Sequence, residues 1–490
     1  MICLAPHPVP AAGPGPVPGP VPAGRGDWAS FAANRHLYNS QGQLSVGRVL
    51  DRDGDVLSWV DESGQRCYYS NATVRKATLH AVGDPNGAIG TGALVAFADQ
   101  LSGYNLLTGA DNPFGQGNDL YLTLDARLNY IAYQALNGRK GAVGVYNYKT
   151  GEILCMVSAP SFDPAAPPEI QDGDPRYEGV YLNRFLSSTF TPGSVFKTVT
   201  LTAALEQLPD LFQRTFTCTG STVVGGETIT CPFAHGEMDI NDAFASSCNG
   251  VFAQLADELG AETIAQYAKQ AGLLDRYSVS GISTATGSVA LEGATSAQLG
   301  WAGVGQYHDL VNPCALMVWM GGVANGGKAA VPYLVLKTEG GFPLPASHIT
   351  RRTGRLIQAD TAQVLADMMS QNVVLTYGAD RFPNMDLCAK SGTAEVEAAS
   401  SPVPGLPASC GIRTSSRLRR SGGGGRQRRG RGRQCGRSGA GCPGQRILTL
   451  NDRRRRCLPA LLKQRTPCAA SGSRSTRFAK SPCTLKTDKV

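Results

Sequence analysis

The sequence lacks any long uninterrupted run of apolar residues. A helix that spans a membrane needs about 20 consecutive apolar residues, and no stretch in these 490 residues approaches that length. The segment 8–24 consists instead of Pro, Gly, Val and Ala, in the order PVPAAGPGPVPGPVPAG. As written, residues 1–26 are therefore a stiff Pro/Gly-rich linker that cannot pack into a core.

The genetic code offers a second interpretation of this segment. A proline codon CCT read one base later begins with CT, which encodes leucine. The same DNA in the neighbouring frame is therefore compatible with a Leu-rich helix long enough to cross a membrane. The alternatives for residues 1–26 are thus a linker and a mistranslated membrane anchor.

Acidic and aromatic residues are nearly absent from the last ninety residues. Residues 401–490 contain 22 Lys and Arg, 2 Asp and Glu, and a single aromatic residue, Phe478. The net charge of +8 is therefore the sum of −12 for residues 1–400 and +20 for this tail. A segment of this composition cannot build a core and is expected to be disordered.

Two explanations of the basic tail 401–490 compete. Such a charge is typical of a segment that binds nucleic acid or an anionic polymer. A change of reading frame near residue 400 also accounts for it, because the codons for residues 410–425 are then compatible with alternating Val, Gly, Leu, Phe and Ala. We favour the frame change, and nucleic acid is not an expected partner.

Three short motifs stand in order along the chain: Ser194-Val-Phe-Lys197, Ser-Cys-Asn at 247–249, and Lys-Ser-Gly-Thr at 390–393. A serine hydroxyl is a poor nucleophile unless a base lies within hydrogen-bond reach. If the Pro-Gly pair at 192–193 opens a helix, Ser194 and Lys197 share one face of it. The start of that helix also offers N–H groups and a dipole that suit an oxyanion.

A lysine acts as a base only when burial or a second cation lowers its pKa. Lys390 is the candidate second cation, on a predicted strand whose Gly392 lets a substrate backbone lie close. Each motif alone is commonplace: a solvated helix start, a cap and a turn. Their order and spacing, about fifty and about one hundred and forty residues apart, indicate acyl transfer.

The three motifs resemble those of the class B penicillin-binding proteins. Residues 47–54 (GRVLDRDG) and 122–125 (LTLD) are similar to the opening strand and the entry to the transpeptidase domain of this family. Further similar segments are TGEIL at 150–154, SAPSFDP at 158–164, LNR at 182–184, GVGQ at 303–306 and VANGG at 323–327. The resemblance covers residues 27 to 397.

The resemblance implies a peptidoglycan D,D-transpeptidase that cross-links stem peptides through an acyl-enzyme and is acylated by β-lactams. Ser194 would be the nucleophile, Lys197 its base, and Ser247 the group that relays a proton to the leaving amine. Which lysine is the true base stays open. Lys390 would be the fourth catalytic residue, and with Thr393 it would also hold the terminal carboxylate. The substrate-binding residues would be Asn249, Ser391, Gly392 and Thr393.

The family also implies partners and a location. We expect a glycosyltransferase in the same wall-synthesis complex, and a position on the outer face of the bacterial cell membrane through an anchor that this frame does not show. A β-lactamase or β-lactam sensor would share the motifs, but the length of the chain before residue 115 argues against both. A noncatalytic wall-binding homologue is the serious alternative, because the strands that should follow Thr393 are absent from this frame.

The predicted fold is α+β: a penicillin-binding transpeptidase (serine β-lactamase-like) fold with an antiparallel sheet flanked by helices. A β-rich pedestal at 27–118 precedes the transpeptidase domain at 119–400, whose C-terminal strands are predicted to be lost, and 401–490 is the tail. We expect a hairpin at 141–158. We expect helices near 126–137, 194–206, 249–259, 262–271, 312–325 and 359–371.

Cys218 and Cys231 flank a hairpin-like segment, so a disulfide between them is geometrically reasonable in an extracytoplasmic domain. With His235 they make only three metal ligands, whereas structural zinc normally uses four. No metal and no cofactor are therefore expected. Cys248 is interpreted as a small core residue, and the glycosylation-like pattern at Asn71 as a plain surface turn.

Overall fold

The computed structural model describes residues 47–102, 117–340, 349–382 and 386–395, and the backbone of 409–418. The Pro/Gly-rich segment 1–26 and the tail beyond 418 lie outside these ranges, so their alternatives stay predictions. Within the described ranges, no helix is both long enough and apolar enough to cross a membrane.

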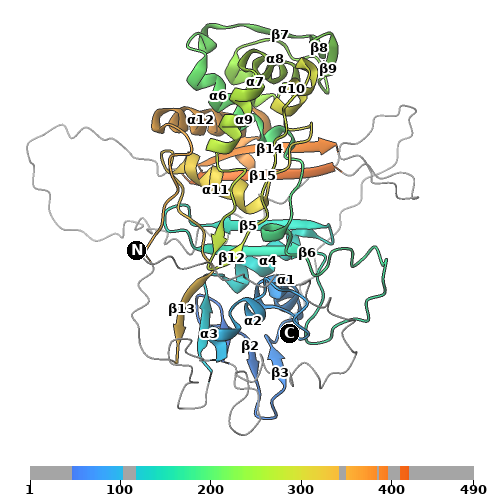
Figure 1. Ribbon diagram of the computed structural model, residues 1–490, viewed down its shortest axis with the longest axis vertical. Coiled ribbons are helices and arrows are strands. Elements are labelled where there is room, and N and C mark those ends of the chain that lie inside the picture. Colours follow the sequence, from blue (N-terminus) through green and yellow to red (C-terminus); the bar gives the residue numbers. More distant parts are fainter. Residues whose placement is uncertain (1–46, 103–116, 341–348, 383–385, 396–408, 419–490) are drawn as a thin grey trace, which may run out of the picture.

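A five-stranded sheet lies at the lower end of the molecule (Figure 1). In spatial order its strands are β13 (Val335–Glu339), β4 (Asp119–Leu122), β1 (Val49–Leu50), β2 (Val56–Val60) and β3 (Arg66–Tyr68). Strand β1 pairs antiparallel with β2 and parallel with β4, while β13 pairs antiparallel with β4. The sheet thus combines strands from both sides of residue 118, and the proposed domain boundary there stays a prediction.

Helices complete this lower part. They are α1 (Ala72–Val82), α2 (Ala93–Ala96) and α3 (Ala98–Ser102). Exposed Asn71 caps α1, because its side-chain oxygen accepts hydrogen bonds from the N–H groups of Thr73 and Val74 at 2.8 and 3.2 Å. The glycosylation-like pattern is therefore a helix cap on the surface.

The predicted hairpin at 141–158 is confirmed as β5 (Gly141–Tyr146) and β6 (Ile153–Ala159), which pair antiparallel. Helix α4 (Ala126–Leu136) begins after Asp125, whose carboxylate accepts a hydrogen bond from the Leu128 N–H. Buried side chains of α4 and β6 pack together in one apolar cluster. This layer separates the lower sheet from the upper part of the molecule (Figure 1).

Helices dominate the upper part. The predicted helices are confirmed there as α6 (Lys197–Gln207), α8 (Asn249–Leu259), α9 (Ala261–Gln270), α11 (Pro313–Ala324) and α12 (Ala359–Asn372). The structure adds α7 (Ile240–Ala245), α10 (Ser296–Gly303) and the short α5 (Arg184–Ser187), whose Phe185 and Leu186 pack in the apolar cluster of the lower sheet. Short turns of other helix types are η3 (Gly193–Val195), η4 (Leu211–Gln213), η5 (Val373–Tyr377) and η6 (Ala379–Arg381). The predicted helix at 194–206 thus begins as the separate 3-10 turn η3.

The pair β11 (Ser278–Val279) with β12 (Ile282–Ser283) lies low in the molecule, near β5, and packs in the apolar core of the lower sheet (Figure 1). The short strands of the upper part form two further pairs, β7 (Phe216–Cys218) with β10 (Gly236–Met238) and β8 (Ser221–Val224) with β9 (Glu227–Thr230). Beneath them, an apolar core with fully buried Trp319, Phe244 and Phe252 joins the helices. Helices α6, α8 and α12, which border the site, are therefore fixed by one core.

Strand β14 (Leu387–Glu395) pairs antiparallel with β15 (Ser409–Leu418). The prediction that the strands after Thr393 are lost is therefore wrong for residues 409–418. The composition of the tail suggested the loss, but a strand ladder is made by main-chain N–H and C=O groups. A run with two arginines can consequently still complete the pair.

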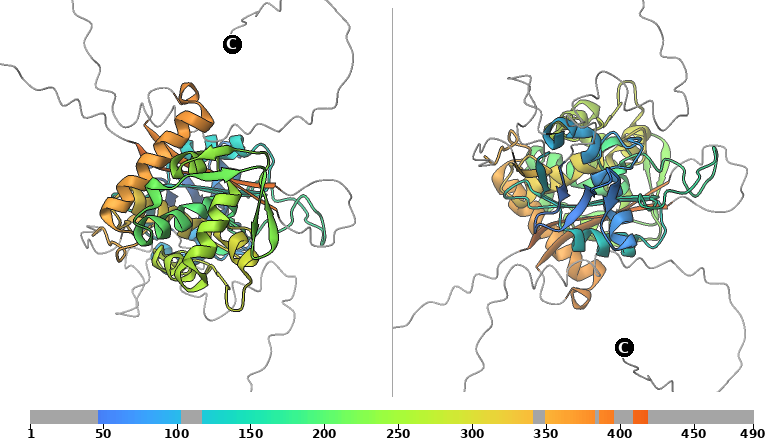
Figure 2. Two further views of the ribbon diagram at one scale, coloured as in Figure 1. Left: turned by 90° about the horizontal axis from the view of Figure 1, so that it is seen from above. Right: turned by 90° about the horizontal axis from the view of Figure 1, so that it is seen from below.

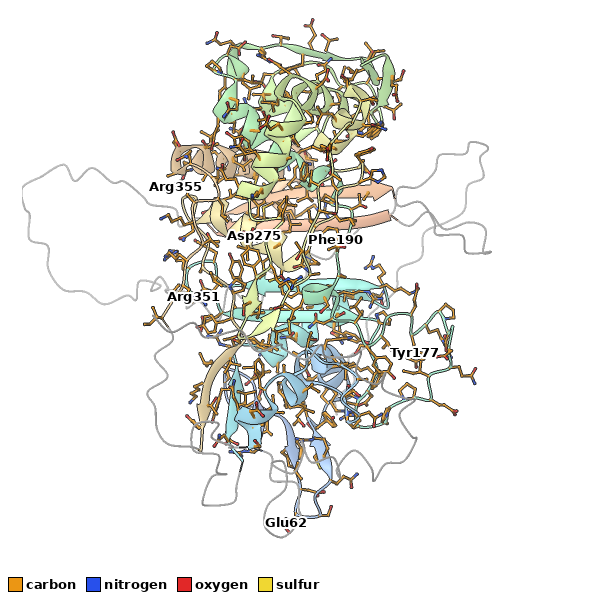
Figure 3. All side chains as sticks on the ribbon, in the orientation of Figure 1. Glu62, Tyr177, Phe190, Asp275, Arg351 and Arg355 are labelled. Carbon is orange, nitrogen blue, oxygen red and sulfur yellow. The ribbon has the colours of Figure 1, made fainter. Side chains whose placement is uncertain are left out.

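The figures show how these layers are stacked. From the top of Figure 1 downward lie the helices together with strands β7, β8 and β9, then β14 with β15, then β5 with β6, and finally the five-stranded sheet. Viewed from above, the helices lie in front, and viewed from below the strands of the lower sheet do (Figure 2). In Figure 3, Glu62 marks the lower tip and Tyr177 a lateral loop.

Candidate active site

Ser194 lies in the turn η3, directly before α6. Gly193 has a φ of +56° and donates its N–H to the carbonyl oxygen of Gly305 at 2.8 Å. A Cβ at Gly193 would come within 2.4 Å of the carbonyl oxygen of Thr393. Only glycine therefore lets this turn lie against β14, which brings the first motif beside the third.

Lys197 is the first residue of α6, and its side chain is fully buried. Its ammonium nitrogen donates to the carbonyl oxygen of Ser247 at 2.6 Å, to Asn249 Oδ1 at 2.7 Å and to Ser247 Oγ at 3.3 Å. Burial, and secondly the nearby charge of Lys390, lower the pKa of Lys197 well below its ordinary value. A neutral, proton-accepting lysine is thereby favoured.

Lys390 extends from β14 to the same Ser247 hydroxyl, and it is only 1% exposed. Its Nζ donates to Ser247 Oγ at 2.9 Å and to the Ser391 carbonyl at 3.1 Å. Burial lowers the pKa of Lys390 to about 7. Near neutral pH this group therefore exchanges between its charged and neutral forms.

The hydroxyl of Ser247 accepts hydrogen bonds from both lysines. Ser247 has a φ of +57°, in the left-handed region that non-glycine residues rarely adopt. Such a conformation costs about 1–3 kcal/mol and persists where the surroundings hold it. A hydroxyl between two amines can pass a proton from one side to the other, as the relay role requires.

The structure thus brings Lys197, Ser247, Asn249 and Lys390 into direct contact. Ser391 and Gly392 continue β14, where a Cβ at Gly392 would lie 2.9 Å from the carbonyl oxygen of Pro192. Thr393 is exposed on the same strand. Every predicted site residue therefore lies in the turn before α6 or on its first residue, just before or at the start of α8, or on β14.

Sequence reasoning missed the residues that hold β14 in place. Tyr377, in η5, accepts the Ser391 N–H at 2.7 Å and donates to Ser391 Oγ at 2.6 Å. Asn372 donates to the Ala389 carbonyl at 2.8 Å and to the Tyr377 hydroxyl at 3.2 Å. Gln306, which lies in a segment quoted above for its resemblance, donates to the Thr393 carbonyl at 2.8 Å.

The cysteines do not form the disulfide that the sequence left possible, whereas Cys248 is buried in the core as interpreted. Cys218 and Cys231 are free thiols, so the disulfide between them does not form. Cys218 Sγ lies 3.4 Å from His235 Nδ1, and Cys231 Sγ lies 3.7 Å from Cys248 Sγ. Cys248, interpreted above as a small core residue, therefore supplies a fourth metal-ligating group, which the sequence argument against zinc did not count.

Residues 141–402 match the family model described as the penicillin binding protein transpeptidase domain. The chain belongs to this family. Among curated proteins, it is 29% identical over 309 residues to the peptidoglycan D,D-transpeptidase PbpA of Mycobacterium tuberculosis strain H37Rv, which covers 57% of this chain and 61% of that protein. It is 32% identical over 255 residues to stage V sporulation protein D of Bacillus subtilis, covering 49% of the chain and 38% of that relative.

Solved structures confirm the fold of this transpeptidase-family chain. Penicillin-binding protein A from M. tuberculosis, solved as a ceftriaxone acyl-enzyme, superposes with a TM-score of 0.65 at 22% identity, covering 78% of this chain and 91% of that one. The D,D-transpeptidase domain of a peptidoglycan glycosyltransferase from Eggerthella lenta gives 0.62 at 25% identity, covering 76% and 90%. The resemblance to class B penicillin-binding proteins and the α+β fold are thus confirmed, whereas the chain spans less than two thirds of its curated relatives.

We expect Tyr377→Phe to weaken both the fold and the candidate site of the chain. The change leaves the Ser391 N–H without its acceptor, which costs about 1–3 kcal/mol of unfolding free energy. Because Ser391 follows Lys390 directly, acylation by a penicillin should slow by about ten- to hundredfold. Urea unfolding and stopped-flow acylation measure the two effects. Tyr181→Phe is the control, since that residue is 44% exposed, and equal behaviour of both variants would contradict the role of Tyr377.

We expect the stability of the wild type to rise more steeply with pH than that of Lys390→Met. Below about pH 7 Lys390 is protonated in both the folded and the unfolded state, and the folded state bears the full cost of the buried charge. Between about pH 7 and about pH 10.4 the unfolded state binds more protons, so the unfolding free energy increases with pH. The excess over the variant should reach about 2 kcal/mol or more.

Urea unfolding at about pH 7 and about pH 9.5 measures this excess. Lys149→Met is the matched control, because Lys149 is exposed and should leave the wild-type slope unchanged. Parallel pH dependences of the wild type and Lys390→Met would show that Lys390 keeps an ordinary pKa in the folded protein.

Proposed function

We propose that the chain is a serine D,D-transpeptidase that cross-links peptidoglycan stem peptides through an acyl-enzyme and is acylated by β-lactams. The observation that carries the proposal is the Ser247 hydroxyl, which accepts hydrogen bonds from the buried amines of Lys197 and Lys390, while the turn of Ser194 packs against the strand that carries Lys390. Family membership supports the same reaction, which is the activity named for the relative PbpA.

In the proposed acylation, Ser194 Oγ attacks the carbonyl carbon between two D-alanines. A bond forms between Oγ and that carbon, and the serine proton passes to Lys197. The carbon–nitrogen bond then breaks, and Ser247 relays a proton to the leaving amine of the terminal D-alanine. With a β-lactam the same steps open the ring, and the leaving amine stays attached to the acyl group.

In the proposed deacylation, an amine of a neighbouring stem peptide attacks the acyl-enzyme. A new amide bond forms and the ester bond to Ser194 breaks. The attacking amine gives up one proton to the neutral lysine of the relay, and Ser194 Oγ takes a proton back from that lysine. The lowered pKa of Lys197 supports its role, because a neutral amine is available to take the proton in the first half of the cycle.

Substrate binding is proposed for residues that line β14 and the start of α8. Asn249 would bond the substrate amide, since its Nδ2 carries two protons and the Thr230 carbonyl accepts only one of them, at 2.9 Å. Lys390 in its charged form and the Thr393 hydroxyl would hold the terminal carboxylate. Ser391 and the small Gly392 would let the peptide backbone lie along the strand.

The cellular setting is part of the same proposal. Residues 27–118 would be the pedestal and 119–400 the transpeptidase domain, located on the outer face of the bacterial cell membrane where stem peptides are found. A glycosyltransferase that makes the glycan strands would be the partner. The names of the relatives, which are peptidoglycan transpeptidases and a sporulation protein, support this setting.

A fluorescent penicillin tests the proposal. The full chain, purified in folded form, should become covalently labelled to about one equivalent, and an excess of unlabelled penicillin G should prevent the labelling. A folded chain that stays unlabelled but sediments with purified peptidoglycan would instead identify a noncatalytic wall-binding protein. Circular dichroism and size-exclusion chromatography establish that the tested chain is folded.

A further inference from the structure

Four metal-ligating side chains converge near the upper end of the molecule: Cys218, Cys231, His235 and Cys248. One ligand atom from each lies within 4.8 Å of the others. Cys218 and Cys248 are buried, and Cys231 and His235 are half-buried. They come from the end of β7, the residue after β9, the residue before β10 and the residue before α8.

Two of the separations fit the edges of a zinc tetrahedron. With zinc–sulfur bonds of about 2.3 Å and zinc–nitrogen bonds of about 2.0 Å, two sulfur ligands lie about 3.8 Å apart and a sulfur and a nitrogen about 3.5 Å apart. The pair Cys231–Cys248 measures 3.7 Å, and Cys218 to His235 Nδ1 measures 3.4 Å. We propose that these four residues bind one zinc ion in a tetrahedral Cys₃His site.

Packing alone does not account for the cluster. Buried cysteines are common as small apolar core residues, but a histidine directed at a thiol has no such role. The ring of His235 packs against that of Phe233, with centroids 4.5 Å apart and planes inclined at 55°, which restricts its orientation. The Gly250 N–H donates to Cys231 Sγ at 3.4 Å. Hydrogen bonds of this type, from groups that do not themselves bind the metal, orient metal ligands.

The surrounding structure explains what the ion would stabilise. The pairs β7 with β10 and β8 with β9 have three or four residues per strand, and most residues of β8 and β9 are not buried. Two-stranded pairs are marginal by themselves, and structural zinc contributes folding free energy directly. The ion would tie both hairpins to the start of α8.

The same ion would hold the second motif of the active site. Cys248 stands between Ser247, with its φ of +57°, and Asn249. Asn249 also donates to the carbonyl of Thr230, the residue before Cys231. A zinc–sulfur bond at Cys248 would thus help to keep Ser247 in its strained conformation against the two lysines. This positioning role, unlike the metal site itself, rests on the proposed function.

Metal analysis of the full chain tests the site. Wild-type protein purified without chelator should contain one zinc more per chain than Cys218→Ser and one more than Cys231→Ser. Cys67→Ser, a half-buried free thiol far from the cluster in the chain, should match the wild type. The test rests on the difference in zinc content between the wild type and the variants. The absolute content is less informative, because the tail 401–490 carries six further cysteines that can bind zinc. Equal zinc in the wild type and both cluster variants would overturn the proposal.

A second test begins with the wild type alone. Chelation of the wild type should lower its unfolding temperature, and one added equivalent of Zn²⁺ should restore it. Cobalt in place of zinc should give a thiolate-to-metal absorption band that Cys67→Ser keeps and Cys218→Ser diminishes. A Cys231–Cys248 disulfide found by mass spectrometry in the purified chain would overturn the proposal, because both sulfurs would then be unavailable.

Acylation separates the two proposals. Chelated wild type should react with fluorescent penicillin about tenfold or more slowly, and zinc should restore the rate. If zinc binds as described but Ser194 is never labelled, the transpeptidase function is wrong and the metal site stands. If labelling is normal and the cluster binds no zinc, the metal site is wrong and the function stands.

Discussion

Replacement of Ser194 by alanine is expected to abolish formation of the penicilloyl-enzyme, with a loss of at least about 10³-fold in labelling. The reason is chemical: the amines of Lys197 and Lys390 and the hydroxyl of Ser247 remain, but the oxygen that forms the ester is gone. Ser194 is half-buried in a short turn, so the unfolding free energy should change by no more than about 0.5 kcal/mol. Mass spectrometry of the intact chain and of its peptides measures the adduct.

Ser246→Ala is the matched control for this variant. Its hydroxyl donates to the Asp242 carbonyl at 2.7 Å at the end of α7, directly before Ser247. The control should retain full labelling, which shows that a serine lost next to the site is tolerated. An adduct that persists in Ser194→Ala, or one mapped to another residue in the wild type, would contradict the role of Ser194.

Local signals explain why most helices could be predicted from the sequence. Asp125 precedes α4 and Asn312 precedes α11, and each accepts hydrogen bonds from the first turn of its helix. Such caps can be recognised in a sequence because the capping side chain and the N–H group that donates to it are only two or three residues apart. The motif residues Lys197, Ser247 and Lys390 were found in a similar way, by the residue types and order that acyl transfer requires.

Contacts between distant segments explain the errors. Nothing near Tyr377 in the sequence indicates that its hydroxyl holds Ser391 on β14. Cys248 is a core residue, as interpreted, but its place in the core did not indicate that its sulfur lies 3.7 Å from the sulfur of Cys231, which follows another strand. The pairing of β15 with β14 was missed because composition describes side chains, and the ladder is made by the main chain.

Lys197→Met should lower the acylation rate constant by about 10²–10⁴-fold, the usual contribution of a positioned base. Methionine has a similar volume, so the core around α6 should keep its packing, although the Ser247 carbonyl and Asn249 Oδ1 each lose a donor. Stopped-flow acylation at several pH values measures the effect. A rate within tenfold of the wild type would show that Lys197 is not the base.

The pH profile of Lys390→Met decides between the two lysines. The charge of Lys390 lowers the pKa of Lys197 in addition to the effect of burial. Removing that charge raises the pKa of Lys197, so a higher pH is needed to produce the neutral amine. If Lys197 is the base, the acid limb of the acylation profile of Lys390→Met therefore shifts to higher pH. If Lys390 is the base, the limb disappears in Lys390→Met and persists in Lys197→Met, which would reverse the assigned roles.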